Sequence, residues 1–196
     1  MIRISQLAAL TVAPVVLASG LSFAHPIAAP GTEGFAVVVS NTNDVIATYL
    51  GTTAAYTDLL FLDSPVNGLG QIFNNQASPI NSTVNLGSFA AGTELVFRLE
   101  VTNTGDNFFS GLASRNSDGL AHARAQSNWA PNTTLVSFED LWGDPEGING
   151  FNDLSFSFTN VQSTNPVPEP ETYAMLLAGL GLLGFVARRR KQQDAA

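Results

Sequence analysis

Short runs in which apolar and polar residues alternate dominate the chain between residues 25 and 165, where helical periodicity is hard to find. The clearest run is 154–159, in which Leu154, Phe156 and Phe158 alternate with serine and threonine. Successive side chains of a strand point to opposite faces of its sheet, so this pattern predicts a half-buried strand. Residues 95–101 alternate in the same way. We expect further strands at 35–40, 45–50, 56–62, 120–126 and 133–138.

Polar turn sequences separate these runs, among them Asn67-Gly68 and the stretches near 103–106 and 116–119. Short strands joined by polar turns over roughly 140 residues predict an all-β fold, and specifically an antiparallel β-sandwich of jelly-roll-like type at residues 25–163. A closed barrel is the alternative. A domain of this size buries a sufficient core without disulfide bonds.

Composition excludes several classes of function. The 196 residues include no cysteine and two histidines, and the formal net charge is −8. The lack of cysteine excludes disulfide scaffolds, thiol catalysis and thiolate metal sites, and two histidines do not make a histidine-rich metal centre. Residues 25–165 hold three arginines, no lysine and thirteen acidic residues. Because nucleic acids are bound through clustered basic residues, we expect no nucleic acid partner.

Carboxylates and amides gather in a glycine-rich acidic segment, residues 138–154, between two of the expected strands. Ca²⁺ takes about six to eight oxygen ligands in flexible geometry, which a loop of this kind can supply. Without a cation, the grouped carboxylates would repel one another. The spacing does not fit an EF-hand, because Ile148 stands where an oxygen ligand is needed. A solvated acidic loop with hydrogen-bonded turns is the alternative.

His122 lies in an alternating stretch near Arg115, Asp118 and Arg124. A catalytic interpretation would make this histidine a general base, but no nucleophile with a local signature accompanies it. We therefore interpret His122 as structural and expect the protein not to be an enzyme.

Residues 1–24 have the features of a secretory signal peptide. Arg3 gives a positive start, an apolar stretch follows over 7–19, and Ser22-Phe23-Ala24 supplies small residues at the positions that a signal peptidase reads. We expect cleavage between Ala24 and His25. A retained membrane helix is the alternative, although the apolar stretch is short for crossing a bilayer.

The C-terminal end has three consecutive features. Residues 164–172 form a proline-rich linker that contains Pro168-Glu169-Pro170, and its three prolines, Pro166, Pro168 and Pro170, disfavour a helix. Residues 173–187 are an uncharged apolar run, which predicts a transmembrane helix although it is shorter than the roughly 20 residues of a comfortable span. Residues 188–196 form a basic tail that holds the C-terminus on the cytoplasmic side and places the folded domain outside. The basic residues are Arg188, Arg189, Arg190 and Lys191.

In this order the three features resemble the PEP-CTERM sorting signal of Gram-negative bacteria. The resemblance implies an inner-membrane intermediate, cleavage near Pro168-Glu169-Pro170 by an exosortase, and delivery to the cell surface or the extracellular matrix. Proteins with this signal are associated with exopolysaccharide and with biofilm or floc matrix. An ordinary single-pass anchor is the alternative.

The acidic segment resembles a family of secreted bacterial β domains of unknown function that often accompany such signals. The resemblance rests on Phe138-Glu139-Asp140, the glycine-rich loop and Phe151-Asn152-Asp153, followed by an apolar strand. The chain departs from the family pattern at Gly150, where an acidic residue is frequent, and in its longer loop. The resemblance implies Ca²⁺ ligands at Glu139, Asp140, Asn152 and Asp153, with Asp144 as a further candidate.

These observations lead to one main hypothesis and two alternatives. The main hypothesis is a secreted, exosortase-processed, non-enzymatic surface or matrix protein that binds Ca²⁺ and contacts exopolysaccharide. The first alternative is a carbohydrate-binding module in which Trp129, Trp142 and the tyrosines stack on sugars. The second is a polysaccharide hydrolase that uses paired carboxylates such as Glu139 and Asp153.

Overall fold

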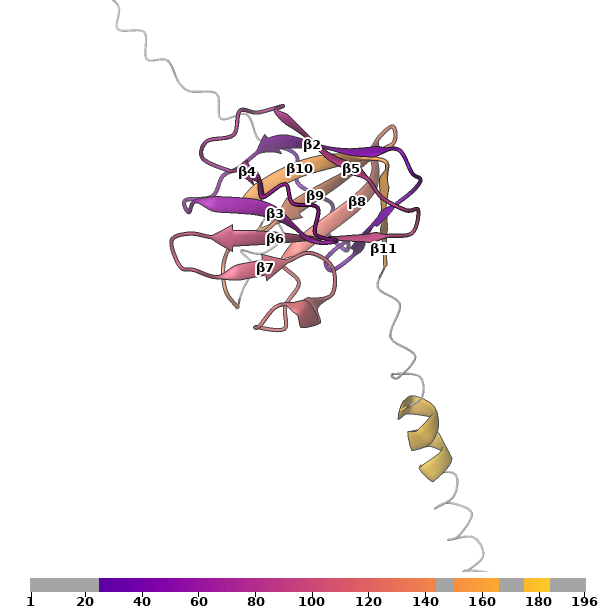
Figure 1. The fold of residues 1–196 in the computed structure, drawn as a ribbon. Helices are drawn as coiled ribbons and strands as arrows, with labels where there is room; N and C mark the ends of the chain where they lie inside the picture. Colours follow the sequence, from indigo (N-terminus) through magenta and orange to yellow (C-terminus); the bar gives the residue numbers. More distant parts are fainter. Residues whose placement is uncertain (1–24, 144–149, 166–174, 184–196) are drawn as a thin grey trace, which may run out of the picture.

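The structure is a computed structural model that describes residues 25–143, 150–165 and 175–183. The described residues form two antiparallel sheets, one short 3₁₀ helix, η1, and a helix at 175–183 (Figure 1). The elements are β1 (Ala36–Val39), β2 (Asp44–Gly51), β3 (Asp58–Ser64), β4 (Gln71–Asn74), β5 (Thr83–Ser88), β6 (Glu94–Val101), β7 (Asn107–Phe109), η1 (Ala113–Arg115), β8 (Ala123–Ala130), β9 (Thr133–Phe138), β10 (Leu154–Thr159) and β11 (Val161–Thr164).

The first sheet has the strand order β11-β1-β6-β3-β4, with β7 paired to β6. The second sheet has the order β5-β2-β10-β9-β8. Buried residues of both sheets form a single hydrophobic core, so the sheets pack face to face as a sandwich. The all-β expectation is therefore confirmed, while the finer likeness to a jelly roll stays a prediction.

Phenylalanines of opposite sheets form the centre of the core. The ring of Phe97 on β6 stacks on that of Phe158 on β10 with the centroids 4.4 Å apart, and it meets the edge of Phe156 at 5.8 Å. All three side chains are fully buried. The alternation in 95–101 and 154–159 places these rings on the inner faces, as the sequence predicts.

The expectation that 154–159 is half-buried is wrong, because Ser155 and Ser157 on the other face of β10 are buried as well. The N-terminal segment of the domain covers this face. The amide of Ala28 donates a hydrogen bond to Ser137 Oγ on β9 at 2.9 Å, and Ser137 Oγ lies 3.0 Å from Ser155 Oγ. Short hydroxyl side chains leave room for the covering segment and give its backbone hydrogen-bond partners.

The three arginines of the domain all take part in ion pairs. Arg115 forms a two-point contact, because its two terminal nitrogens contact the two carboxylate oxygens of Glu94 at 2.7 and 2.9 Å. This bidentate arrangement fixes the orientation of the Arg115 guanidinium group and also compensates its charge. The pairs are Arg98–Glu100, Arg115–Glu94 and Arg124–Glu33.

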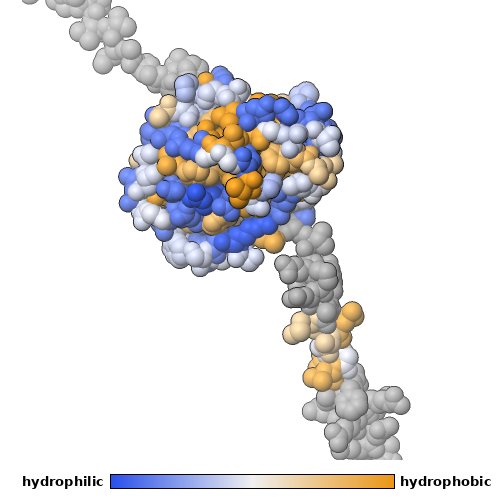
Figure 2. Space-filling model, viewed as in Figure 1, coloured by the Kyte–Doolittle hydropathy of each residue, from blue (hydrophilic) through white to orange (hydrophobic). Residues whose placement is uncertain are grey.

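Residues 175–183 form a helix whose residues are all exposed, and its apolar side chains are coloured orange in Figure 2. Within the described ranges, no helix has the length and apolar character needed to cross a membrane. The structure describes only part of the expected span 173–187. The signal peptide at 1–24, the linker from residue 166 onward and the basic tail at 188–196 lie outside the described residues.

Candidate metal centre

Three of the predicted ligands meet at one end of the second sheet. Glu139 and Asp140 follow β9 directly, and Asp153 directly precedes β10. These two strands pair in antiparallel register with Phe138 opposite Leu154, so the end of one strand lies beside the start of the next. One carboxylate oxygen from each acidic residue lies within 4.8 Å of the other two. Strand pairing therefore brings together carboxylates that the loop separates in sequence.

The three carboxylates are buried: Glu139, Asp140 and Asp153 are 1%, 4% and 8% exposed. A solvated acidic loop is therefore the wrong description of these residues. Backbone amides support the group, since the amide of Asp140 donates to Asp153 Oδ2 at 2.9 Å and that of Leu141 donates to Glu139 Oε1 at 3.1 Å. Such hydrogen bonds stabilise carboxylates but leave their mutual repulsion in place.

A fourth carboxyl group, that of Asp58 on the first sheet, lies near Asp140 and Asp153. Asp58 is the first residue of β3 and is completely buried. Burial, reinforced by the nearby carboxylates of Asp140 and Asp153, raises the pKa of Asp58 to about 8. The sequence analysis missed this residue, because a lone aspartate at the start of an apolar strand gives no local sign of such neighbours.

Asn75 holds Asp58 in place. The Asn75 side chain accepts a hydrogen bond from the Asp58 amide at 2.9 Å and donates one to Asp58 Oδ2 at 2.8 Å. The hydroxyl of Tyr49, on β2 of the second sheet, donates to the Asn75 carbonyl at 2.7 Å. Burial, together with the Asp58 charge, raises the pKa of Tyr49 to about 12, so the hydroxyl stays protonated and able to donate. This network orients the Asp58 carboxyl.

A cavity of about 340 Å³ opens beside the carboxylates, between the β2–β3 connection and the segments that flank β9 and β10. Its volume leaves room for water molecules next to Asp140 and Asp153. Asn152, a predicted ligand, lines this cavity, whereas Asp144 lies outside the described residues. The lining residues are Thr53, Ala54, Ala55, Tyr56, Asp140, Leu141, Asn152 and Asp153.

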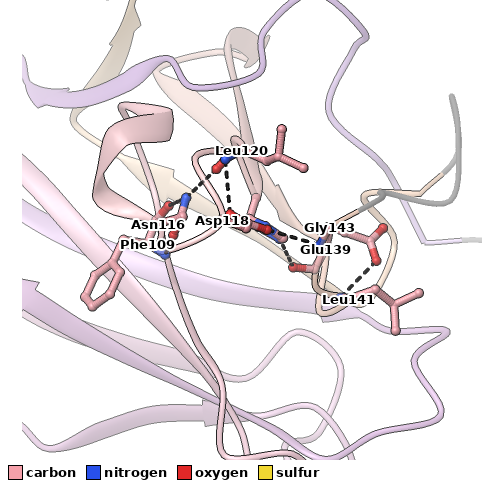
Figure 3. A network of polar contacts seen from close by, with 8 residues as sticks. Phe109, Asn116, Asp118, Leu120, Glu139, Leu141 and Gly143 are labelled. Carbon is pink, nitrogen blue, oxygen red and sulfur yellow. Dashed lines mark hydrogen bonds and ion pairs between the residues drawn. The ribbon is translucent and has the colours of Figure 1, made fainter.

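Asp118 and His122 fasten the segment that carries two of the carboxylates (Figure 3). His122 Nε2 lies 2.8 Å from Asp118 Oδ2, and His122 Nδ1 lies 3.3 Å from the carbonyl oxygen of Glu139. The amide of Gly143 donates to the same Asp118 oxygen at 3.1 Å. His122 is fully buried and its two ring nitrogens face these partners, which fits its structural interpretation.

The Asp118 carboxyl is adapted to carrying a negative charge. Burial alone would raise the pKa of Asp118, but hydrogen bonds from the Leu120 amide, the His122 ring and the Gly143 amide together lower it. Asp118 is therefore an anchor for the 139–143 segment, and its charge is satisfied by donors. Sequence analysis noted Asp118 only as a neighbour of His122.

The two tryptophans considered for sugar stacking are partly exposed, Trp129 by 39% and Trp142 by 55%. Trp129 lies near the end of β8, beside the start of β9, whereas Trp142 follows the end of β9. The six residues of β9 span roughly 20 Å. This separation does not favour one shared aromatic platform. Of the predicted cleavage site, Ala24 lies outside the described residues, and His25 packs against Gly51 at the end of β2.

Comparison with known proteins identifies the C-terminal segment. A protein-family model described as the PEP-CTERM protein-sorting motif matches residues 166–191. The predicted sorting motif is thereby confirmed, and it implies export, processing by an exosortase, and a surface or extracellular destination. Neither the curated proteins nor the solved structures include a match to the chain. The likeness of the acidic segment to a secreted domain family stays a prediction.

Proposed function

We propose that the protein is a non-enzymatic component of the cell surface or extracellular matrix whose β-sandwich binds Ca²⁺ through Glu139, Asp140 and Asp153. The observation that carries this proposal is the approach of three buried carboxylates to within 4.8 Å of one another. Burial of several like charges is unfavourable unless a cation compensates them. The sorting motif supports a location in which Ca²⁺ is abundant.

The donor set favours Ca²⁺ over transition metals, because every candidate ligand is an oxygen. Ca²⁺–oxygen distances are about 2.3–2.6 Å, so two ligands on opposite sides of one ion lie about 5 Å apart, in keeping with the spacing found here. Water in the adjoining cavity and the Asn152 side chain complete the coordination in this proposal. Ca²⁺ suits such an irregular donor set better than Mg²⁺, which requires near-octahedral geometry.

The negative charge of the domain indicates that cations mediate its binding to acidic exopolysaccharide in this proposal. The three arginines of residues 25–165 are paired with glutamates, and thirteen acidic residues outnumber them. Direct attraction between two acidic surfaces is unfavourable. Bound or bridging cations therefore supply the attraction in this proposal. A signal peptidase, an exosortase and a membrane-bound intermediate belong to the same scheme of export.

The metal proposal is tested by thermal unfolding of the full-length chain in 5 mM CaCl₂ and in EDTA. For an extracellular Ca²⁺ module with a dissociation constant of about 10⁻⁴ M, this concentration adds about 2 kcal/mol of stability. The midpoint should rise by about 5 °C. Asp153→Asn should abolish the rise. Asp63→Asn, which alters an exposed aspartate that contacts Arg98, should keep it. Equal midpoints of the wild type in both solutions would contradict the proposal.

A further inference from the structure

We propose that Asp58 is a fourth carboxylate ligand of the same cation, so that the bound ion connects the two sheets of the sandwich. This inference rests on the proposed function and extends it. Asp58 begins β3 in the first sheet, whereas Glu139, Asp140 and Asp153 flank β9 and β10 in the second. The ribbon in Figure 1 shows β3 in front of β9 and β10, with the core between the two layers.

The two oxygens of Asp58 differ in their surroundings. Oδ2 accepts the hydrogen bond from Asn75, while Oδ1 is buried and accepts no hydrogen bond from an N–H or hydroxyl donor in the described part of the chain. The carboxyl of Asp140 lies within hydrogen-bonding reach of the Asp58 carboxyl. The Asp58 side chain is completely buried, and its carboxyl lies against that of Asp140. A buried oxygen without a donor costs free energy, and such atoms are rare in folded proteins. Asp58 Oδ1 therefore needs a hydrogen-bond donor or a cation as its partner.

Two facing carboxylates cannot satisfy each other, because both groups only accept hydrogen bonds when ionised. A proton or a cation between them is needed. The neighbouring residues favour a cation, since Asp153 adds a third carboxylate within electrostatic reach of Asp58 and the cavity beside Asp140 and Asp153 admits water. One proton bridges one pair of oxygens, whereas a divalent cation compensates several carboxylates at once.

The position of Asp58 is fixed before any ion arrives. Asn75 contacts Asp58 through three hydrogen bonds, including its own amide to the Asp58 carbonyl at 3.1 Å. Tyr49 reaches Asn75 from the second sheet. A rotamer held in this way presents Oδ1 to the cluster at little further entropic cost, which is the condition for an effective ligand.

Calorimetric titration of CaCl₂ into the full-length chain tests the role of Asp58. Asp58→Asn keeps the shape of the side chain and its hydrogen bond with Asn75 but removes the charge. We expect this variant to bind Ca²⁺ at least about tenfold more weakly than the wild type. Asp63→Asn, at an exposed position of the same strand, is the matched control and should bind within about twofold of the wild type.

Hydrogen exchange of the wild-type chain gives a second readout that needs no variant. If the ion connects the sheets, Ca²⁺ should slow amide exchange in peptides that cover β3 and Asn75 as well as in those that cover 139–143 and 150–153. Both the weaker binding and the protection of β3 are required. Protection confined to the segments flanking β9 and β10, or undiminished affinity of Asp58→Asn, would overturn the inference and leave the proposed function standing.

Absence of Ca²⁺ binding by the wild type would overturn the proposed function and this inference together. If Asp58→Asn does not fold, the exchange pattern of the wild type decides between the two arrangements. The outcomes therefore separate a cation held by one sheet, a cation held by both, and no cation at all.

Discussion

Asp58→Asn should stabilise the metal-free protein at neutral pH, although it removes a buried, hydrogen-bonded side chain. The pKa of Asp58 is about 8 in the folded protein and 3.8 in an ordinary environment. At pH values between these two pKa values, Asp58 is ionised in the unfolded chain but still protonated in the folded protein. Stability therefore falls as the pH rises through this window, because the folded state binds more protons. The asparagine side chain carries no such proton.

The size of the effect follows from the width of the window. Each pH unit between the two pKa values costs the wild type about 1.4 kcal/mol. Between pH 5 and pH 7.5 the loss through Asp58 should amount to about 3 kcal/mol. The variant should be about as stable as the wild type near pH 4, and its advantage should grow toward pH 8.

Urea unfolding in EDTA at pH 5, 6 and 7.5 measures this advantage. All other titrating groups are common to both proteins, so the difference between their free energies of unfolding reports on Asp58 and its interaction with Asp140 and Asp153. Asp63→Asn, measured in parallel, controls for the replacement of an aspartate by asparagine at an exposed position of the same strand. A difference between Asp58→Asn and the wild type that stays constant from pH 5 to pH 7.5 would refute the reasoning.

Two further predictions concern the sorting signal and the loop anchor. Deletion of residues 168–170 should leave the protein unprocessed in the membrane fraction, as followed by immunoblotting, and normal release of this variant would count against exosortase handling. Asp118→Asn should cost about 1–2 kcal/mol of stability at pH 7, because the carboxylate accepts hydrogen bonds that hold 139–143. Folding lowers the pKa of Asp118, so its charged form stabilises the fold above the ordinary aspartate pKa, and this contribution disappears as the pH falls through the lowered value. A loss in urea unfolding that is the same at pH 7 and at acidic pH would contradict this assignment.

Regular alternation made much of the fold predictable. The expected strands 133–138 and 154–159 coincide with β9 and β10. Apolar residues recur at every second position of 154–159, and 133–138 is rich in β-branched and apolar residues. The strands β4, β5, β7 and β11 were not expected. β4, β7 and β11 have only three or four residues. β5 (TVNLGS) and β11 (VQST) contain mostly small or polar residues, so pairing with neighbouring strands rather than local sequence makes them strands.

Prediction of the site succeeded where its residues are close in sequence and stopped where they are not. Glu139, Asp140 and Asp153 stand out in one acidic segment, and the pairing of β9 with β10 joins them. Asp58 enters the group only through the order of strands across two sheets. The burial of Ser155 depends in the same way on the N-terminal segment that crosses β9 and β10. The order of apolar and polar residues along the chain indicates neither the approach of Asp58 to the acidic segment nor the burial of Ser155.

The scarcity of basic residues should make the domain resistant to proteases that cut after lysine or arginine. Proteases that cut after lysine or arginine find no lysine and three arginines between residues 25 and 165. Arg98 and Arg124 lie within paired strands, and the Arg115 side chain is held in an ion pair with Glu94. A protease must bind an extended, accessible peptide in its active-site cleft, and none of these three sites provides one. Digestion of the folded domain by trypsin-like enzymes should therefore be slow. For the same reason, amine-directed cross-linking has no lysine side chain to attach to in this region.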